Sequence, residues 1–416
     1  MTIKKRLTSL FARWYTSDKR RAKLYRHAER QLARQNRQGQ GDCYLRADDP
    51  YSYLLSQLIP RLCESYPLNL DPVIVTRLPD NCYPEQQLLA DYALGDCQRL
   101  AAAYGLEPPI KRSAMSEKAN LALCKAAQQP DPWSTIATIF KALWVTQEAI
   151  PGIHSHEIAE LRKQLQDNNL LMAKRGHYLT AMIDYAGDKY WGLDRLHYLE
   201  RRFNDGELLF PYPDQEMLAG PAGTGKGKSL SCYFSIRSPY SYILLPRLFA
   251  LADHYKCQLD LKPLLPMVTR GLPVPSVKRF YILLDVKREA NRYKIPFGYI
   301  SDPLGKGVEN ALALHDYAKS MGKERAFLLA ITKACWSEGI DLSNTKNLHS
   351  ICRQLELDWP SCEQALQNDN WRSVVEENRQ ELYEYGLWGV PAMTVDSLVV
   401  WGQDRLWMVD RYLRAC

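Results

Sequence analysis

Three short motifs in the C-terminal half of the sequence contain residue types that can bind a thiolate and an extended peptide. Ser238-Pro239 begins a helical pattern, Gly389-Val390-Pro391 precedes a strand pattern, and Gln403-Asp404 begins the last helical pattern. The first turn of a helix presents unpaired N–H groups and the positive end of the helix dipole, and a thiolate placed there has a lowered pKa. A serine at that position can donate a hydrogen bond to the bound sulfur.

Each motif also has a purely structural explanation. Ser238 and Asp404 are favoured N-cap residues, a role that contributes about 1 kcal/mol, and Pro391 can be an ordinary loop proline. The functional interpretation is a cis peptide bond at Pro391 that offers backbone groups to a peptide. Asp404 would then pair with the ammonium group of the peptide while the helix N–H groups hold its carboxylate.

The elements that must position these motifs alternate between strand and helix patterns. We expect a strand at 230–235, a helix from 239 to about 255, a strand at 257–262, a helical region at about 277–385, a hairpin of 392–395 and 398–401, and a last helix at 405–413. This order, β-α-β followed by a helical insert and β-β-α, describes a thioredoxin-like fold with an inserted helical domain.

The N-terminal half of the sequence repeats the same signals in the same order. The matching pairs of segments are 48–55 with 237–244, 75–77 with 268–270, 96–99 with 285–288, and 191–196 with 401–406. Four matches predict a tandem duplication, and hence an α/β protein of two tandem thioredoxin-like domains, each with an inserted helical subdomain. The expected boundaries are a basic amphipathic helical arm at 1–40, a first copy at 41–213, a Gly-rich linker at 214–229 and a second copy at 230–416.

The two copies differ where chemistry is expected. Asp49 stands opposite Ser238, and Thr180 is paired with Pro391, in a hairpin that we expect to carry an extra residue. A fixed carboxylate at a helix start repels a thiolate and occupies the positive end of the dipole. We therefore expect the first copy to be a silent scaffold.

Taken together, the segments 234–242, 389–391 and 401–406 resemble the 2-hydroxychromene-2-carboxylate isomerases and the kappa-class glutathione transferases, in the DsbA-like branch of the thioredoxin superfamily. The resemblance implies a glutathione-dependent transferase or isomerase that acts on a small electrophile, with glutathione as cosubstrate and no metal. It also implies a homodimer, or a first copy that stands in for the partner subunit as an internal pseudo-dimer. The family often has an asparagine before the prolines of segment 270–275, and this sequence has none.

The resemblance assigns roles to particular residues of the second copy. It implies that Ser238 faces the sulfur of glutathione, that Val390 and Pro391 pair with the cysteinyl backbone, and that Gln403 and Asp404 hold the γ-glutamyl end. By the same resemblance, Lys278 lies near the glycine carboxylate. Two other functions stay open: a non-catalytic binding or scaffold protein, and a thiol-disulfide oxidoreductase, which would need C-x-x-C where the sequence reads Ser-Pro-Tyr-Ser at 238–241.

The composition limits the setting in which this chemistry takes place. Eleven cysteines without a C-x-x-C predict reduced thiols and a cytoplasmic protein, and no apolar run is long enough to predict a transmembrane segment. The segment 220–226 fits G-x-x-x-x-G-K, but Gly227 stands where a phosphate-binding loop needs serine or threonine.

The net charge of +7 is concentrated in the arm, because residues 1–40 hold twelve Lys or Arg against Asp18 and Glu29. Leu7, Leu10, Phe11, Trp14 and Tyr15 follow a helical spacing along one face. That face can dock onto the protein's own domains. Alternatively, the arm can lie on an anionic membrane surface or contact nucleic acid.

Overall fold

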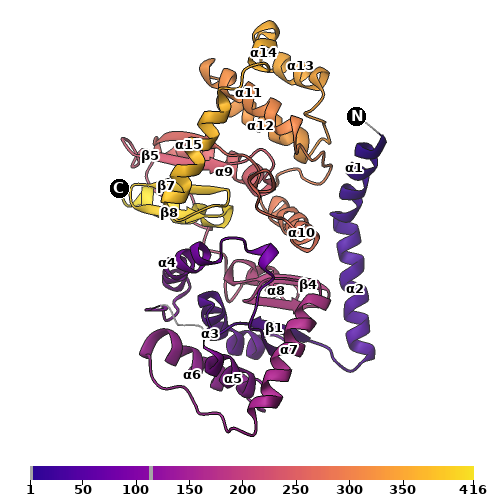
Figure 1. Cartoon of the computed structure of the whole chain (residues 1–416), viewed down its shortest axis with the longest axis vertical. Coiled ribbons are helices and arrows are strands. Elements are labelled where there is room, and N and C mark those ends of the chain that lie inside the picture. Colours follow the sequence, from indigo (N-terminus) through magenta and orange to yellow (C-terminus); the bar gives the residue numbers. More distant parts are fainter. Residues whose placement is uncertain (1–2, 112–115) are drawn as a thin grey trace. The chain divides into compact units, whose positions relative to one another are not determined.

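The computed structural model of the chain describes residues 3–111 and 116–416, so the first two residues of the expected arm lie outside the described residues. The chain forms two compact units (Figure 1). Unit 1 comprises residues 1–20, 214–274 and 279–416, and unit 2 comprises residues 21–213 and 275–278. The expected domain boundaries remain a prediction, but the arm is divided between the units at Arg20.

Each unit is built on a mixed four-stranded sheet. In unit 2 the order is β2-β1-β3-β4, and in unit 1 it is β6-β5-β7-β8. In both sheets the first two strands along the chain are parallel and the other pairings are antiparallel. The strands are β1 (Gln40–Leu45), β2 (Asn69–Ile74), β3 (Met182–Tyr185), β4 (Asp188–Trp191), β5 (Ser229–Phe234), β6 (Gln258–Pro263), β7 (Ala392–Val395) and β8 (Leu398–Trp401).

The helices of each unit lie largely between the parallel strand pair and the hairpin in sequence, as the expected helical inserts require. Those before the second sheet are α1 (Ile3–Tyr15), α2 (Asp18–Arg34), α3 (Pro50–Ser65), α4 (Gln86–Tyr104), α5 (Glu117–Ala126), α6 (Pro132–Lys141), α7 (Ile158–Lys174) and α8 (Leu196–Glu200). Those after β5 are α9 (Pro239–Tyr255), α10 (Ser276–Arg292), α11 (Lys306–Ser320), α12 (Glu324–Trp336), α13 (Thr345–Gln354), α14 (Trp359–Ala365), α15 (Trp371–Glu384) and α16 (Leu406–Arg414). The predicted fold class, two thioredoxin-like domains with helical inserts, is confirmed.

In both units a buried tryptophan of the helical insert donates a hydrogen bond to the loop that follows the central strand of the sheet. The indole N–H of Trp144 donates to the carbonyl of Ala47 at 3.1 Å, and that of Trp336 donates to the carbonyl of Ile236 at 3.0 Å. In each case a large apolar ring is buried and its polar atom is satisfied by the loop that follows the central strand. These contacts hold the loops that precede α3 and α9.

The two hairpins correct one part of the sequence comparison. In both, ten residues run from the first to the last paired position, with Met182 opposite Trp191 and Ala392 opposite Trp401. The hairpins therefore have equal length, and Ala181, not Thr180, is the counterpart of Pro391. The N–H of Gly192 donates to Ala181 and the N–H of Gly402 donates to Pro391, which confirms this register. The prediction of an extra residue in the first hairpin is therefore wrong, because it paired Thr180 with Pro391 without knowledge of the strand register.

The Gly-rich segment before β5 is pinned to the ends of α9 and α16. The N–H of Gly223 donates to the carbonyl of His254 at 2.9 Å, and Thr224 Oγ1 donates to the carbonyl of Leu413 at 2.6 Å. A Cβ on Gly225 would lie 3.1 Å from the carbonyl oxygen of Tyr255, so glycine permits this close approach. No strand leads directly into the segment, and the element that follows it is strand β5 rather than a helix. The segment therefore lacks the strand–loop–helix context of a phosphate-binding loop.

Candidate active site

Ser238 caps the first helix of the second copy, as its position before a proline predicts. Its backbone is extended, Pro239 occupies the first turn of α9, and its Oγ accepts a hydrogen bond from the N–H of Ser241 at 3.2 Å. The same Oγ lies 3.4 Å from the carbonyl oxygen of Val390, to which it donates. This second hydrogen bond is long, and Ser238 is only half-buried, so the hydroxyl can be redirected to another acceptor.

The Val390-Pro391 peptide bond is cis, as the sequence analysis predicted, and it faces Ser238. The preceding Gly389 packs closely against the Trp401 ring: a Cβ at this position would lie 2.7 Å from the indole, so a larger residue would clash. The hydroxyl of Ser238 and the cis-proline loop are therefore brought together at the N-terminus of α9. Such a combination presents a helix dipole, a hydroxyl and a strand-like backbone edge to one small ligand.

Arg270, which was not among the predicted site residues, contacts the segment that leads into the cis proline. Its Nη2 donates to the carbonyl oxygen of Trp388 at 2.9 Å, two residues before Val390. Its Nε and Nη1 are buried without a hydrogen-bond partner in the described part of the chain, and burial lowers the pKa of the guanidinium. Guanidinium groups remain charged in proteins, so these two donors suit an anion.

The signal that could have found Arg270 was already visible in the repeat. Segment 268–270 matches segment 75–77, so an arginine recurs after the second strand of each copy. The sequence does not show that the short 3₁₀ helix Met267–Arg270 turns this arginine toward the loop that precedes the hairpin. That proximity is a tertiary contact between positions 118 residues apart.

Gln403 and Asp404 lie at the start of the last helical segment, but not as a capping pair. A 3₁₀ helix, Gln403–Arg405, precedes α16, and neither Gly402 nor Arg405 makes a side-chain capping bond there. The Gln403 amide is buried and committed: Oε1 accepts from Arg247 Nη1 at 2.5 Å and Nε2 donates to Glu289 Oε2 at 2.9 Å. Its Nε2 also donates to Asp404, which is partly exposed. The Gln403 side chain thus bridges Arg247 and Glu289. The glutathione-binding roles predicted for Gln403 and Asp404 stay predictions.

Lys278 groups with unit 2 rather than with Ser238, which belongs to unit 1. Its Nζ donates to the carbonyl oxygen of Cys82 at 2.8 Å and lies 5.5 Å from the centre of the Tyr83 ring. Burial among these groups lowers the pKa of the Lys278 amine. None of these described contacts connects it with the cis-proline loop, so its role near a glycine carboxylate stays a prediction.

The first turn of α9 is tied to the helical insert through Tyr240. Its hydroxyl donates to Asp285 Oδ2 at 2.7 Å, and Arg288 Nη2 donates to Asp285 Oδ1 at 2.6 Å. The equivalent bond joins Tyr51 to Asp96 at 2.8 Å in unit 2. Because both copies have it, this network fixes the helix start and does not distinguish an active copy from a silent one.

The corresponding position in unit 2 is closed. Asp49 caps α3 by accepting from the N–H of Tyr51 at 3.1 Å, and its Oδ2 accepts from Ser52 Oγ and Thr180 Oγ1, both at 2.7 Å. Asp49 and Thr180 are 8% and 4% exposed, and the peptide bond before Ala181 is not cis. A buried carboxylate with satisfied oxygens can neither donate to a thiolate nor attract one.

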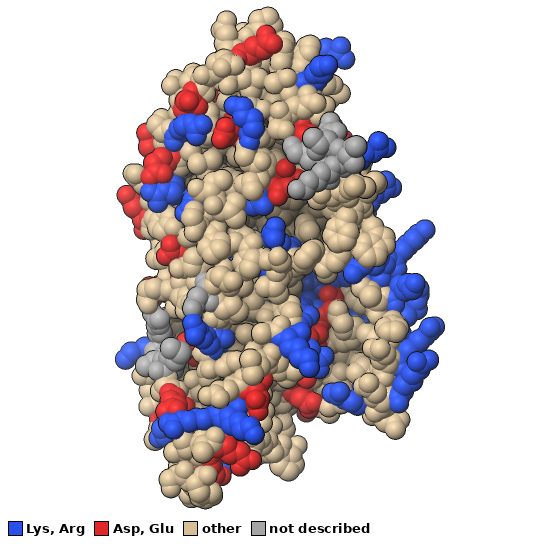
Figure 2. Space-filling view, turned by 45° about the vertical axis from the view of Figure 1, so that its right-hand side comes forward, with Lys and Arg blue, Asp and Glu red and all other residues tan. Residues whose placement is uncertain are grey.

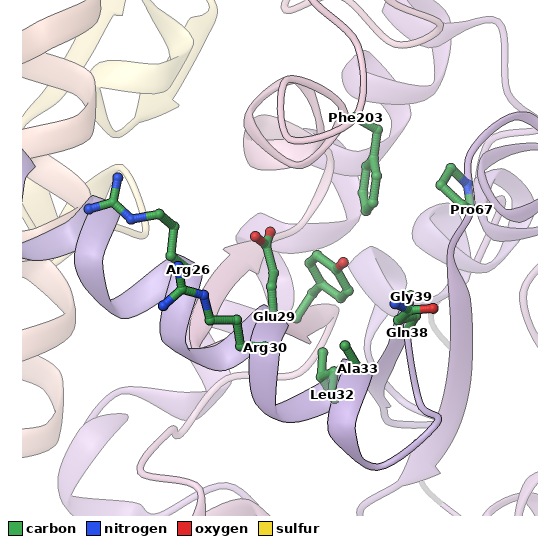
Figure 3. Close-up of a pocket in the computed structure, with 10 residues that line it drawn as sticks. Arg26, Glu29, Arg30, Leu32, Ala33, Gln38, Gly39, Pro67 and Phe203 are labelled. Carbon is green, nitrogen blue, oxygen red and sulfur yellow. The ribbon is translucent and has the colours of Figure 1, made fainter.

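A cavity of about 520 Å³ lies elsewhere, in unit 2 beside α2 (Figure 3). It is lined by Arg26, Glu29, Arg30, Leu32, Ala33, Gln38, Gly39, Pro67, Tyr185 and Phe203. None of the predicted site residues lines it, and Glu29 is paired with Arg202. In the described residues no group of three His, Cys, Asp or Glu side chains is placed to hold a metal ion.

Residues 229–414, which contain this site, match the family model of the DSBA-like thioredoxin domain. This match confirms the resemblance that the motifs carry. The chain is 27% identical over 194 residues to a 2-hydroxychromene-2-carboxylate isomerase of Sphingobium xenophagum, covering 45% of this chain and 98% of that protein. It is also 27% identical over 190 residues to the enzyme of that name from Pseudomonas putida, covering 43% of this chain and 90% of that protein. A solved structure of such an isomerase aligns with a TM-score of 0.40 at 24% identity, over 44% of this chain and 94% of that chain.

Proposed function

We propose that the second copy is a glutathione-dependent isomerase or transferase for a small electrophilic, aromatic-derived substrate. The observation that carries the proposal is the contact of Ser238 Oγ with the carbonyl oxygen of Val390, 3.4 Å apart, at the N-terminus of α9. It joins a donor hydroxyl, a helix dipole and a cis-proline loop at one point. These are the groups that the resemblance assigns to thiolate and peptide binding.

The residues at this point suit glutathione chemically. When bound, glutathione supplies a thiolate that adds to an electrophilic carbon and, in an isomerisation, is expelled again without net oxidation or reduction. The Ser238 hydroxyl would leave its long bond to Val390 and donate to the sulfur, while the dipole of α9 lowers the thiol pKa. The backbone of Val390 and Pro391 would orient the peptide, and Asp404 would pair with its ammonium group.

The substrate of the relatives named above carries a carboxylate by its name. In this chain the two partnerless donors of Arg270 lie behind the cis-proline loop, where an arriving carboxylate would satisfy them. Two buried donors without a hydrogen-bond partner are unfavourable, so an anionic ligand that reached them would be stabilised. We therefore propose a carboxylated electrophile as the substrate, with Arg270 as its anion-binding residue.

Two other functions compete with this one. A non-catalytic scaffold would retain the fold and lose ligand binding, and the satisfied Asp49 carboxylate supports that role for the first copy. A disulfide oxidoreductase would need a redox cysteine where Ser238 and Ser241 stand. All eleven cysteines are free and nine are buried, and we place the protein in a reducing compartment, the cytoplasm.

The decisive experiment is calorimetric titration of the full chain with glutathione, followed by assay of 2-hydroxychromene-2-carboxylate isomerisation. Ser238→Asp keeps a capping side chain, so its thermal midpoint should match that of the parent, while its carboxylate should abolish glutathione binding. Ser373→Asp, at an exposed position in the first turn of α15 in the same unit, is the matched control. Equal binding by the Ser238 variant and the parent would refute the assignment, and absence of binding by the parent would favour the scaffold.

A further inference from the structure

Helix α1 is packed with its large apolar side chains turned outward. Its contact with unit 1 is made by small residues: Ser9, Ala12 and Thr16 are 0%, 7% and 3% exposed, and Ser9 Oγ donates to the carbonyl of Ile300. Leu7, Leu10, Phe11 and Trp14 are 61%, 46%, 49% and 57% exposed. The expectation that the apolar face docks onto the protein's own domains is therefore wrong for these four residues.

The helix repeat explains why both faces exist. At 3.6 residues per turn, positions 9, 12 and 16 share one side of α1 and positions 7, 10, 11 and 14 share the opposite side. Two rings of the outward strip are in contact, since the Phe11 and Trp14 ring centres are 5.8 Å apart. A strip of large apolar side chains held outward by a face of small ones is a binding surface rather than a core.

Positive charge accompanies this strip. Arg6 and Arg13 are exposed on α1, which contains no acidic residue between Ile3 and Tyr15. The next helix, α2, carries an exposed row at helical spacing, formed by Lys19, Lys23, Arg26, Arg30 and Arg34. Lys and Arg side chains gather over this helix in Figure 2.

The two acidic residues of α2 do not offset this charge. Asp18 lies 3.7 Å from Lys287 within unit 1, and Glu29 pairs with Arg202 within unit 2. Both helices therefore present uncompensated positive charge, whatever the arrangement of the units.

We propose that helix α1 binds the surface of an anionic lipid bilayer, with the Leu7, Leu10, Phe11 and Trp14 strip inserted at the headgroup boundary and Arg6 and Arg13 on lipid phosphates. The basic row of α2 adds a long-range attraction to the same anionic surface. Interfacial helices combine these two features. A second copy is disfavoured because a symmetric contact would set basic helices against each other. Nucleic acid would explain the basic row of α2 but leaves the apolar strip of α1 without a partner.

The test is flotation of the full chain with vesicles of phosphatidylcholine alone or with roughly one quarter phosphatidylglycerol. The parent should float only with the anionic vesicles, and less at high salt. Leu10→Ser combined with Trp14→Ser should weaken partitioning at least about tenfold. Met321→Ser, at an apolar side chain that is 52% exposed elsewhere in unit 1, should not.

Charge reversal separates the two contributions. Lys23→Glu combined with Arg30→Glu should also weaken flotation, whereas Lys346→Glu on α13 should not. All variants should keep glutathione affinity within about twofold and an unchanged thermal midpoint. Three results would overturn the proposal: no flotation with anionic vesicles, a Trp14-dependent dimer in sedimentation, or tight duplex DNA binding that is indifferent to Leu10 and Trp14 and occurs without vesicle binding.

Discussion

Thr180 Oγ1 donates a 2.7 Å hydrogen bond to Asp49 Oδ2, so that in unit 2 the loop before the hairpin is joined to the start of α3 by a buried carboxylate. In unit 1 the same two places are joined by the hydroxyl of Ser238 and the carbonyl of Val390, at 3.4 Å. The first contact is short, buried and complete. The second is long and partly open, and this difference, rather than the helix caps themselves, distinguishes the two copies at the position of the candidate site.

Removing the Thr180 hydroxyl should destabilise unit 2. Thr180→Val leaves one oxygen of a buried carboxylate with one donor fewer, and we expect a loss of about 1.5–3 kcal/mol in the free energy of unfolding. Urea titration followed by circular dichroism measures it. Thr138→Val, at an exposed helix position, is the matched control and should stay within about 0.5 kcal/mol. A Thr180 variant as stable as its control would show that the bond adds nothing to stability.

One chain should bind one glutathione. Within residues 3–111 and 116–416, only unit 1 has a donor hydroxyl beside a cis-proline loop, and the Asp49 carboxylate repels a thiolate. Calorimetry should give a stoichiometry near one, and Asp404→Ala should weaken binding by roughly 1.5–3 kcal/mol through loss of a charged pair. Asp316→Ala on α11 serves as the control. A stoichiometry near two would show that the first copy is not silent.

Arg270 should distinguish anionic from neutral electrophiles. Arg270→Gln removes the charge beside the cis-proline loop, and kcat/KM for a carboxylated substrate should fall by about one to two orders of magnitude. Values for a neutral electrophile conjugated by the same enzyme should change little. Arg372→Gln, whose guanidinium is paired with Asp369 at the surface of α15, is the control. An equal loss of kcat/KM for carboxylated and neutral substrates would show that Arg270 acts only by holding Trp388 in place.

His177 should make unit 2 sensitive to acid. It is 2% exposed against Tyr44, and burial, followed by the charge of Lys189, lowers its pKa from 6.5 to about 3. The unfolded chain therefore binds this proton more readily, and its contribution to stability, complete above pH 6.5, is lost toward pH 3. The slope is at most about 1.4 kcal/mol per pH unit.

Substitution of His177 by leucine tests this directly, because Leu387 occupies the equivalent buried position in unit 1. The His177→Leu variant should show a flatter dependence of its urea midpoint on pH between about 6.5 and 4. His349→Leu, an exposed change on α13, should leave the dependence as in the parent. Parallel curves for the His177 variant and the parent would contradict the assignment.

Sequence periodicity was sufficient for the elements around the candidate site. The expected helix from 239 to about 255 is α9, and the expected hairpin strands are β7 and β8. These segments are short, strongly patterned and bounded by proline, glycine or a two-residue turn, so local physical chemistry decides them. The serine cap and the cis bond at Pro391 belong to the same local class.

The remaining features depended on contacts between distant positions. The pairing of Ala181 with Pro391 follows from the register of two strands, and composition favoured the neighbouring Thr180 instead. The commitment of Gln403 to Glu289 and Arg247, and the approach of Arg270 to Trp388, join elements that no local pattern relates.

For the arm, the sequence determined that α1 would have an apolar strip, and the tertiary structure decided which way it faces. Residue spacing fixes a helical face, but only packing against Ile300 and its neighbours selects Ser9, Ala12 and Thr16 as the buried side. A pattern along one helix contains no information about the surface that receives it. That surface is formed by chain nearly three hundred residues away, and it determines which face of α1 is buried.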